Sequence, residues 1–105
     1  MPKKKPYPPR DAARPPSHPG AVLREIVLPE LGLSKIEIAR ALQMSRNQLH
    51  LILSEKQPVT PQTAVKLEAA LGSSAKLWLN MQSAYDLWNA QRSVDLKKVR
   101  PLRAA

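Results

Sequence analysis

The sequence predicts an all-α fold, and two observations carry that prediction. Apolar residues recur at helical spacing in five segments between residues 18 and 92, and no segment shows the alternating pattern of a strand. Most of these segments follow a helix-start signal, such as Ser or Thr followed by Pro or, three residues later, by Glu or Gln. The 105 residues suffice for one modest helical core. We therefore expect a single five-helix domain.

Residues 1–17 are expected to form a flexible, disordered N-terminal arm rich in Pro and Lys. They hold six of the chain's eleven prolines and almost nothing to bury. Because proline fixes φ and removes a backbone donor, such a stretch favours an extended chain. His18-Pro19-Gly20 ends the arm, and His18 is interpreted as a packing or capping residue because no second ligand lies at metal-site spacing.

The first helix is expected to begin near Ala21. Its apolar residues at helical spacing are Val22, Leu23, Ile26 and Val27. Pro29 should end or kink this helix, and Gly32 lets the chain turn toward the next one.

Residues 33–53 predict two short helices, at about 35–42 and 46–54. Each opens with the pattern of a capping box: Ser34 stands three residues before Glu37, and Ser45 three residues before Gln48. Starts this close together leave about two turns for the first helix and force a sharp reversal before the second. This is the helix-turn-helix arrangement, whose second helix enters the major groove of DNA. The facing apolar residues are Ile38, Ala39 and Leu42 on the first helix and Leu49, Ile52 and Leu53 on the second.

The fourth helix should begin at Thr60-Pro61, a cap residue followed by proline at the first helical position, and end at Gly72. A fifth helix should begin at Ser73 or Ser74 and run to about Arg92.

Large apolar side chains are concentrated on the fifth helix. Its stripe consists of Leu77, Trp78, Met81, Tyr85 and Trp88, with Leu79 and Leu87 partly off it. We expect the first three to close the core. Tyr85 or Trp88 should form a dimer interface, because one end of a small domain carries more aromatic surface than a core needs.

The net charge of +9 is concentrated at the two ends of the chain. Residues 1–20 carry five Lys or Arg against one Asp, and so do residues 92–105, which include a basic C-terminal tail at 93–105. Such ends suggest a polyanionic partner, because Lys and Arg that neutralise phosphates release counterions. The alternative is that both ends are only solvated.

Recognition helices usually contact bases from their N-terminal residues. The candidates for reading base edges are Arg46, Asn47, Gln48 and His50. Arg suits guanine, and Asn or Gln suits adenine. The candidates for phosphate contact are Lys35 and Ser45, at the two helix starts, and Lys56, after the second helix. Each has an alternative: Arg46 could contact only phosphate, Gln48 could serve only as a cap, and Asn47 and His50 could be exposed surface residues.

Several function classes are disfavoured. There is no cysteine for a disulfide, a thiolate metal site or a nucleophile. The histidines lie far apart, and no Gly-rich phosphate loop is present, so we expect neither an enzyme nor a cofactor or metal site. No apolar run approaches the ~20 residues needed to cross a bilayer, so a cytoplasmic protein is expected.

Four runs together resemble the HigA antitoxins, which are Xre-type, phage-repressor-like helix-turn-helix proteins. They are His18-Pro19-Gly20, the helix pair of residues 34–53, the helix start at 60–64 and the run Leu77-Trp78-Leu79-Asn80-Met81-Gln82-Ser83-Ala84-Tyr85-Asp86-Leu87. The resemblance covers roughly residues 18–91 and extends to proteins named virulence-associated protein I. Two departures stand out: Gln43 occupies the turn where glycine is usual, which suggests a positive φ, and Lys35 stands where glutamine is frequent.

The resemblance implies a homodimer that represses its own operon at an inverted repeat in double-stranded DNA. It also implies a toxin partner, a HigB-like protein of RelE fold that cleaves mRNA, which the antitoxin would neutralise. Two alternatives remain open: a phage-type repressor without a toxin, and a helical adaptor that binds a protein.

Overall fold

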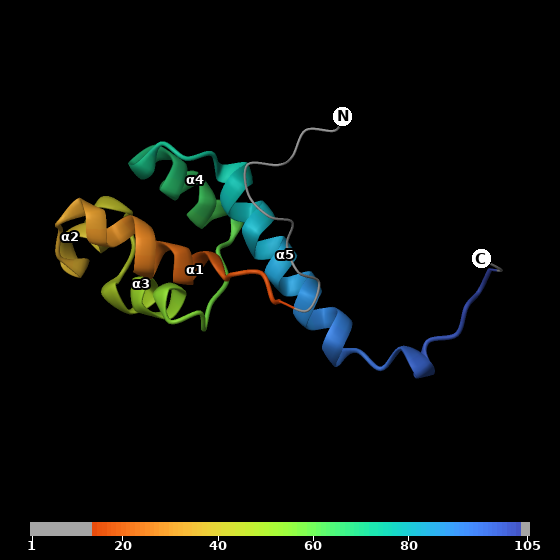
Figure 1. The fold of residues 1–105 in the computed structure, drawn as a ribbon. Helices are drawn as coiled ribbons and strands as arrows, with labels where there is room; N and C mark the ends of the chain where they lie inside the picture. Colours follow the sequence, from red (N-terminus) through yellow and green to blue (C-terminus); the bar gives the residue numbers. More distant parts are fainter. Residues whose placement is uncertain (1–13, 104–105) are drawn as a thin grey trace, which may run out of the picture.

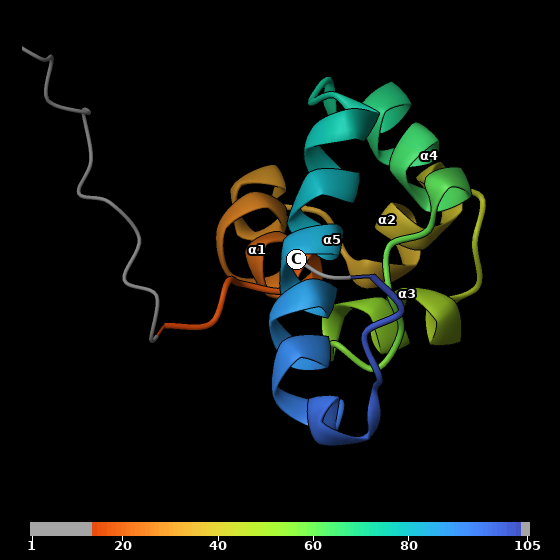
Figure 2. The ribbon, with the colours of Figure 1, turned by 90° about the vertical axis from the view of Figure 1, so that its right-hand side faces the viewer.

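The computed structural model describes residues 14–103, which form five α-helices and, in this range, no strand (Figures 1 and 2). The helices are α1 (Pro19–Val22), α2 (Lys35–Ala41), α3 (Arg46–Leu53), α4 (Pro61–Leu71) and α5 (Ala75–Ser93). A π-helical turn (Leu23–Val27) and a 3-10 turn (Leu28–Leu31) continue α1, and a second 3-10 turn (Leu96–Lys98) follows α5. The predicted five-helix, all-α fold is confirmed. The predicted disorder of the arm falls almost wholly on residues 1–13, outside the described range.

The first helix begins at Pro19, slightly earlier than expected. His18 is its cap, because its Nδ1 accepts a hydrogen bond from the Gly20 N–H at 2.8 Å, as the sequence suggested. The helix then widens: the Leu28 N–H bonds to the Leu23 carbonyl, five residues back. This extra residue in the turn shifts the inward face to Val27 and Leu28. Ile26 is 61% exposed, so the regular helical spacing expected for it is wrong.

The turn of the helix-turn-helix is a Schellman motif built without glycine. Gln43 has φ 54°, as its place in the turn suggested. Its N–H bonds to the Arg40 carbonyl at 3.1 Å, and the Met44 N–H bonds to the Ala39 carbonyl at 3.0 Å. The Lys66 ammonium, from α4, donates to the Gln43 carbonyl at 3.0 Å. These contacts hold a backbone conformation that glycine would adopt more easily.

The end of α3 repeats this motif. Glu55 has φ 66°, and the Lys56 N–H bonds to the Leu51 carbonyl at 2.8 Å. Arg24 closes this end, since its guanidinium donates to the Leu53 carbonyl at 2.6 Å and to the Glu55 carboxylate at 3.2 Å. By contrast, α4 ends at Gly72 with φ 88°, as expected.

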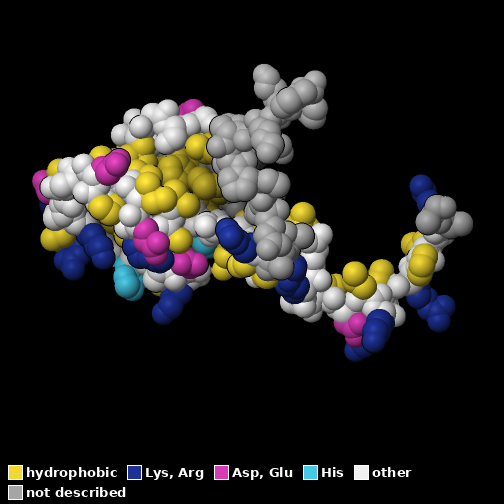
Figure 3. Space-filling model, in the orientation of Figure 1, with side chains coloured by type: hydrophobic (Ala, Val, Ile, Leu, Met, Phe, Trp, Pro, Cys, Tyr) yellow, Lys and Arg dark blue, Asp and Glu magenta, His cyan; other side chains and the backbone are white. Residues whose placement is uncertain are grey.

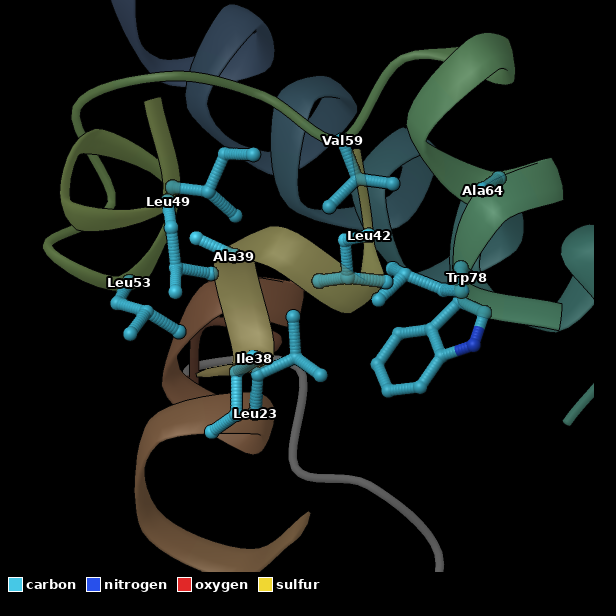
Figure 4. Close-up of a cluster of buried hydrophobic side chains, with 11 residues drawn as sticks. Leu23, Ile38, Ala39, Leu42, Leu49, Leu53, Val59, Ala64 and Trp78 are labelled. Carbon is cyan, nitrogen blue, oxygen red and sulfur yellow. The ribbon is translucent and has the colours of Figure 1, made fainter. Parts of the chain in front are cut away.

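The core lies where α1, α2, α3 and α4 meet the first half of α5 (Figure 4). Its buried apolar members are Leu23, Ile38, Ala39, Leu42, Leu49, Ile52, Leu53, Val59, Ala64, Leu67 and Trp78. All six residues expected between the helices of the pair are among them. Ala39, the smallest side chain of the six, is 2% exposed.

One expectation for α5 is wrong. Trp78 is 2% exposed and Met81 packs against the core, but Leu77 is 48% exposed. Leu79 packs against the core instead. These two leucines lie about 100° to either side of Trp78 on the helix, so spacing alone does not distinguish them.

Gln82 takes a buried place on α5 because both ends of its amide are bonded. Its Oε1 accepts from the Val59 N–H at 2.7 Å, and its Nε2 donates to the Asp86 carboxylate at 2.9 Å. The first bond joins α5 to the segment between α3 and α4, and the second lies within α5. A buried amide is stable only when it is satisfied in this way.

His18-Pro19-Gly20 forms a junction that touches both α3 and α5. A methyl group built on Gly20 would overlap the carbonyl oxygen of Ile52, so only glycine allows this approach of α1 to α3. On the other side, the His18 ring meets the Tyr85 ring edge to face, with centroids 4.8 Å apart. The run therefore has a structural role.

Candidate nucleic-acid interface

The starts of α2 and α3 bring four predicted site residues together. Lys35, Arg46, Asn47 and His50 line one open hollow of about 620 Å³, and all four are exposed. Arg46 and Asn47 occupy the first turn of α3, and His50 lies one turn further along the same side. Lys and Arg side chains gather along the adjoining edge of the molecule, below α2 and α3 in the view of Figure 3. The hollow thus presents donors and positive charge from the N-terminal end of a short helix.

The two helix starts differ in their caps. At α2 the capping box is complete: the Ser34 hydroxyl accepts from the Glu37 N–H at 3.1 Å, and the Glu37 carboxylate accepts from the Ser34 N–H at 3.0 Å. These bonds lower the pKa of Glu37. At α3 only half of the expected box forms. Ser45 accepts from the Gln48 N–H at 3.0 Å, while no bond back from the Gln48 side chain is found in the described chain.

This half-formed box changes the interpretation of Gln48. Its side chain is not committed to capping, which was the alternative to a DNA contact. Gln48 and Ser45 do not line the hollow but adjoin it in sequence. Lys56 is exposed at the opposite end of α3, after the turn at Glu55, and also lies outside the hollow.

Sequence reasoning missed three residues that brace this surface. Lys66 holds the turn before α3, Arg24 holds the turn after it, and Gln82 holds the loop that leaves it. Each bond joins residues at least 23 positions apart, so no local pattern could have indicated it.

The residues expected at a dimer interface have partners within the chain. Tyr85 is half-buried against His18. Trp88 is half-buried, with the Arg92 guanidinium 3.5 Å from its ring centroid. Its indole N–H is buried without a hydrogen-bond partner in the described chain.

Two further findings concern residues 14–103. No three His, Asp or Glu side chains are grouped so that they could hold a metal ion. No helix in this range has the length and apolar character needed to span a bilayer.

Comparison with known proteins identifies relatives over most of the chain. The helix-turn-helix family model HTH_3 matches residues 23–78. Virulence-associated protein I of Dichelobacter nodosus is 43% identical over 75 residues, which are 71% of this chain and 69% of that protein. Antitoxin HigA-1 of Vibrio cholerae serotype O1 is 33% identical over 95 residues, which are 89% of this chain and 90% of that protein.

A solved structure of an antitoxin is also similar to this chain. Antitoxin GraA in complex with its operator matches with a TM-score of 0.77 at 34% identity, over 90% of this chain and 98% of that chain. The chain therefore belongs to the Xre-type helix-turn-helix family, and its relatives include HigA antitoxins and virulence-associated proteins.

Proposed function

We propose that this protein is a HigA-like antitoxin that represses its own operon by binding operator DNA as a homodimer. The observation that carries the proposal is the hollow at the start of α3, where Arg46, Asn47 and His50 converge with Lys35. The similar antitoxin GraA has been solved with its operator, which supports the same use of the fold.

The proposed contacts follow from side-chain chemistry. Arg46 can donate two bonds to guanine O6 and N7, and Asn47 or Gln48 can pair in the same bidentate way with adenine. His50 reaches a base edge one turn along the helix. Lys35, Ser45 and Lys56 contact phosphates on either side, which sets the position of α3 in the groove.

The proposed dimer uses Tyr85 and Trp88 on α5. A two-fold pair would place its two recognition helices about 34–36 Å apart, one turn of DNA, and so favours an inverted repeat. In this scheme residues 18–92 form the DNA-binding domain, while the arm at 1–17 and the tail at 93–105 are accessory basic segments.

The antitoxin role rests on relatedness to HigA-1, which covers most of both chains. We propose that the partner is an mRNA-cleaving toxin of the HigB type. A phage-type repressor would have no such partner, so a small toxin reading frame beside the gene separates the two. Co-purification of that toxin with this chain, and loss of its mRNA cleavage, is the expected result.

The first test is a fluorescence anisotropy titration with DNA from immediately upstream of the gene, against random duplex at physiological salt. We expect a preference of about 10³-fold or more for the upstream DNA. Equal affinity for the two duplexes would reject sequence-specific repression and favour the protein-binding adaptor.

A second test separates base reading from phosphate contact. Arg46→Ala should cost about 1–3 kcal/mol on the upstream site and flatten the preference. Lys56→Ala should weaken binding to both duplexes alike and reduce the salt slope by about 1. Lys76→Ala, which removes an exposed charge from the start of α5, is the matched control. It should change neither the sequence preference nor the salt slope. Equal losses on both duplexes for Arg46→Ala would make Arg46 a phosphate contact.

A further inference from the structure

The described part of the tail, residues 93–103, carries a series of exposed apolar side chains. Val94, Leu96, Val99 and Leu102 are 52, 67, 58 and 96% exposed. They are interspersed with Lys97, Lys98, Arg100 and Arg103. In Figure 1 this segment leads away from the helices after α5, and Figure 3 shows apolar and basic side chains side by side along it. A tail that only neutralised phosphate would have no use for the apolar series.

An open groove of about 560 Å³ lies between α5 and the segment that joins α3 to α4. Its apolar lining includes Pro58, Leu79, Leu87 and Ala90, and Leu87 is 58% exposed. Asp86 supplies an acidic group in the same lining. The groove therefore offers apolar surface and one negative charge, which complements an apolar and basic segment.

The groove and the proposed dimer residues lie on different flanks of α5. At about 100° per residue, Leu79, Ser83 and Leu87 follow one another on one flank, while Trp88 projects from the opposite one. A partner helix packed on Trp88 would leave the groove open. The tail of that partner would then begin close to α5.

We propose that the tail of each copy docks in this groove of the second copy, in the dimer of the proposed function on which this inference rests. Ten residues, 94–103, span up to about 33 Å when extended. An α-helix with its side chains is about 10–12 Å across, so the tail is long enough to pass around the partner's α5. Two-fold symmetry gives two tails and two grooves, so each tail has one groove in which to dock.

The geometry favours the groove of the partner over the groove of the same copy. α5 ends at Ser93, and the groove reaches Ala90, one turn earlier. A tail entering its own groove would have to turn back within a few residues of Ser93. In Figure 1 the tail first leads away from the helices through the 3-10 turn, where the Asp95 carboxylate accepts from the Lys97 N–H at 3.1 Å.

Because the chain contains no cysteine, disulfide cross-linking tests this arrangement cleanly. Leu87→Cys protein is mixed with tagged Leu96→Cys protein, oxidised mildly and analysed on a non-reducing gel. We expect a mixed dimer as the main cross-linked product. The control replaces Leu87→Cys with Val65→Cys, which is equally exposed (59%) but lies on α4, and should give only traces.

Other outcomes would overturn the inference. Equal cross-linking with the Val65→Cys control would show that the tail has no preference for the groove. A chain carrying both Leu87→Cys and Leu96→Cys that forms an internal disulfide at monomer mass would place the tail in its own groove. Analytical ultracentrifugation separates the two proposals: a monomer refutes the dimer itself, whereas a dimer without the mixed cross-link refutes only the tail docking.

A second measurement tests the energetics without cysteines. Leu87→Ser and Leu96→Ser should each raise the dimer dissociation constant about a hundredfold, because two-fold symmetry withdraws two buried leucines at about tenfold each. The double variant should be little weaker than either single one, because both substitutions remove the same contact. Fully additive effects would contradict the proposed contact.

Discussion

Helices α3 and α5 show two different ways of fixing a helix in a small domain. α3 has eight residues, of which Leu49, Ile52 and Leu53 are buried, and hydrogen bonds from other elements secure the turns at both of its ends. α5 has nineteen residues, of which only Trp78 and Gln82 are buried. The short helix is held at both ends and along its buried face. The long one buries residues only in its first half and meets His18 through Tyr85 just beyond it. The difference fits the proposed function, in which α3 is placed in the DNA groove and the second half of α5 pairs in the dimer.

Replacing each tryptophan of α5 in turn is the strongest test of the difference between the two halves of this helix. Trp78→Ala should lower the free energy of unfolding by about 3–5 kcal/mol, because it opens a cavity in the core. Trp88→Ala should cost much less stability and instead weaken the dimer. Urea unfolding and analytical ultracentrifugation measure the two effects. Equal losses of stability would mean that the second half of α5 also belongs to the core.

The junction at Gly20 provides the next largest effect. Gly20→Ala should lower the free energy of unfolding by about 1–3 kcal/mol or more, because the added methyl group forces α1 away from the Ile52 carbonyl. Thermal unfolding followed by circular dichroism checks this. Gly32→Ala is a useful contrast: nothing lies near its added methyl group, so only the strain of a positive φ should be felt there. A smaller loss at Gly20 than at Gly32 would argue against the close approach.

A smaller effect, of opposite sign, is expected in the turn before α3. Gln43→Gly should raise the free energy of unfolding by about 1 kcal/mol, because it relieves a side chain held at φ 54°. Gly72→Ala, which places a side chain at φ 88°, should lower it by about 1 kcal/mol. Chemical denaturation of both variants tests the pair. A destabilised Gln43→Gly protein would show that the Gln43 side chain contributes more than its strain removes.

The smallest expected effect is a pH dependence of the unfolding free energy, which His18 should contribute only below neutral pH. Burial lowers the pKa of His18, although the carboxylates of Glu55 and Asp86 oppose the shift. Below the ordinary value of 6.5 the unfolded chain therefore binds a proton that the folded chain does not. The stability contributed by neutral His18 is complete above pH 6.5 and is lost as the pH falls toward the lower folded-state pKa.

His18→Asn replaces the capping Nδ1 with a side-chain oxygen that can accept the same bond, and should remove this part of the pH dependence. Unfolding free energies measured at several values between pH 5 and pH 8 would show a shallower slope for the variant. An unchanged slope would assign the acid sensitivity to other groups.

Much of the fold could be predicted because its signals are local. Ser34, Ser45, Thr60 and Ser74 all cap the helices that the sequence assigned to them, and Gly72 ends α4. These signals need only neighbouring residues. The base- and phosphate-contacting residues were chosen in the same way, from the position of a helix start, and four of them share one hollow.

The sequence-based expectations fail where the backbone conformation or a contact with a distant residue determines which side chains are buried. Ile26 faces solvent because the π-helical turn shifts the helical register. Leu77 and Leu79 flank Trp78 symmetrically, and only the packing of the rest of the core puts Leu79 on its inner side. Gln82 enters the core only because Val59, 23 residues away, has a backbone N–H to satisfy. None of these causes can be read from a periodic pattern.

The junction at residues 18–20 has a mechanical consequence for how such proteins could change during evolution. Since it contacts both α3, the proposed reading helix, and α5, the proposed dimer helix, it couples the positions of the two. In the proposed dimer, the way the two α5 helices pair then determines the distance between the two reading helices. Substitutions on α5 could adapt the protein to a new operator spacing while Arg46 and Asn47 stay as they are. Spacing and base preference would thus be free to evolve independently.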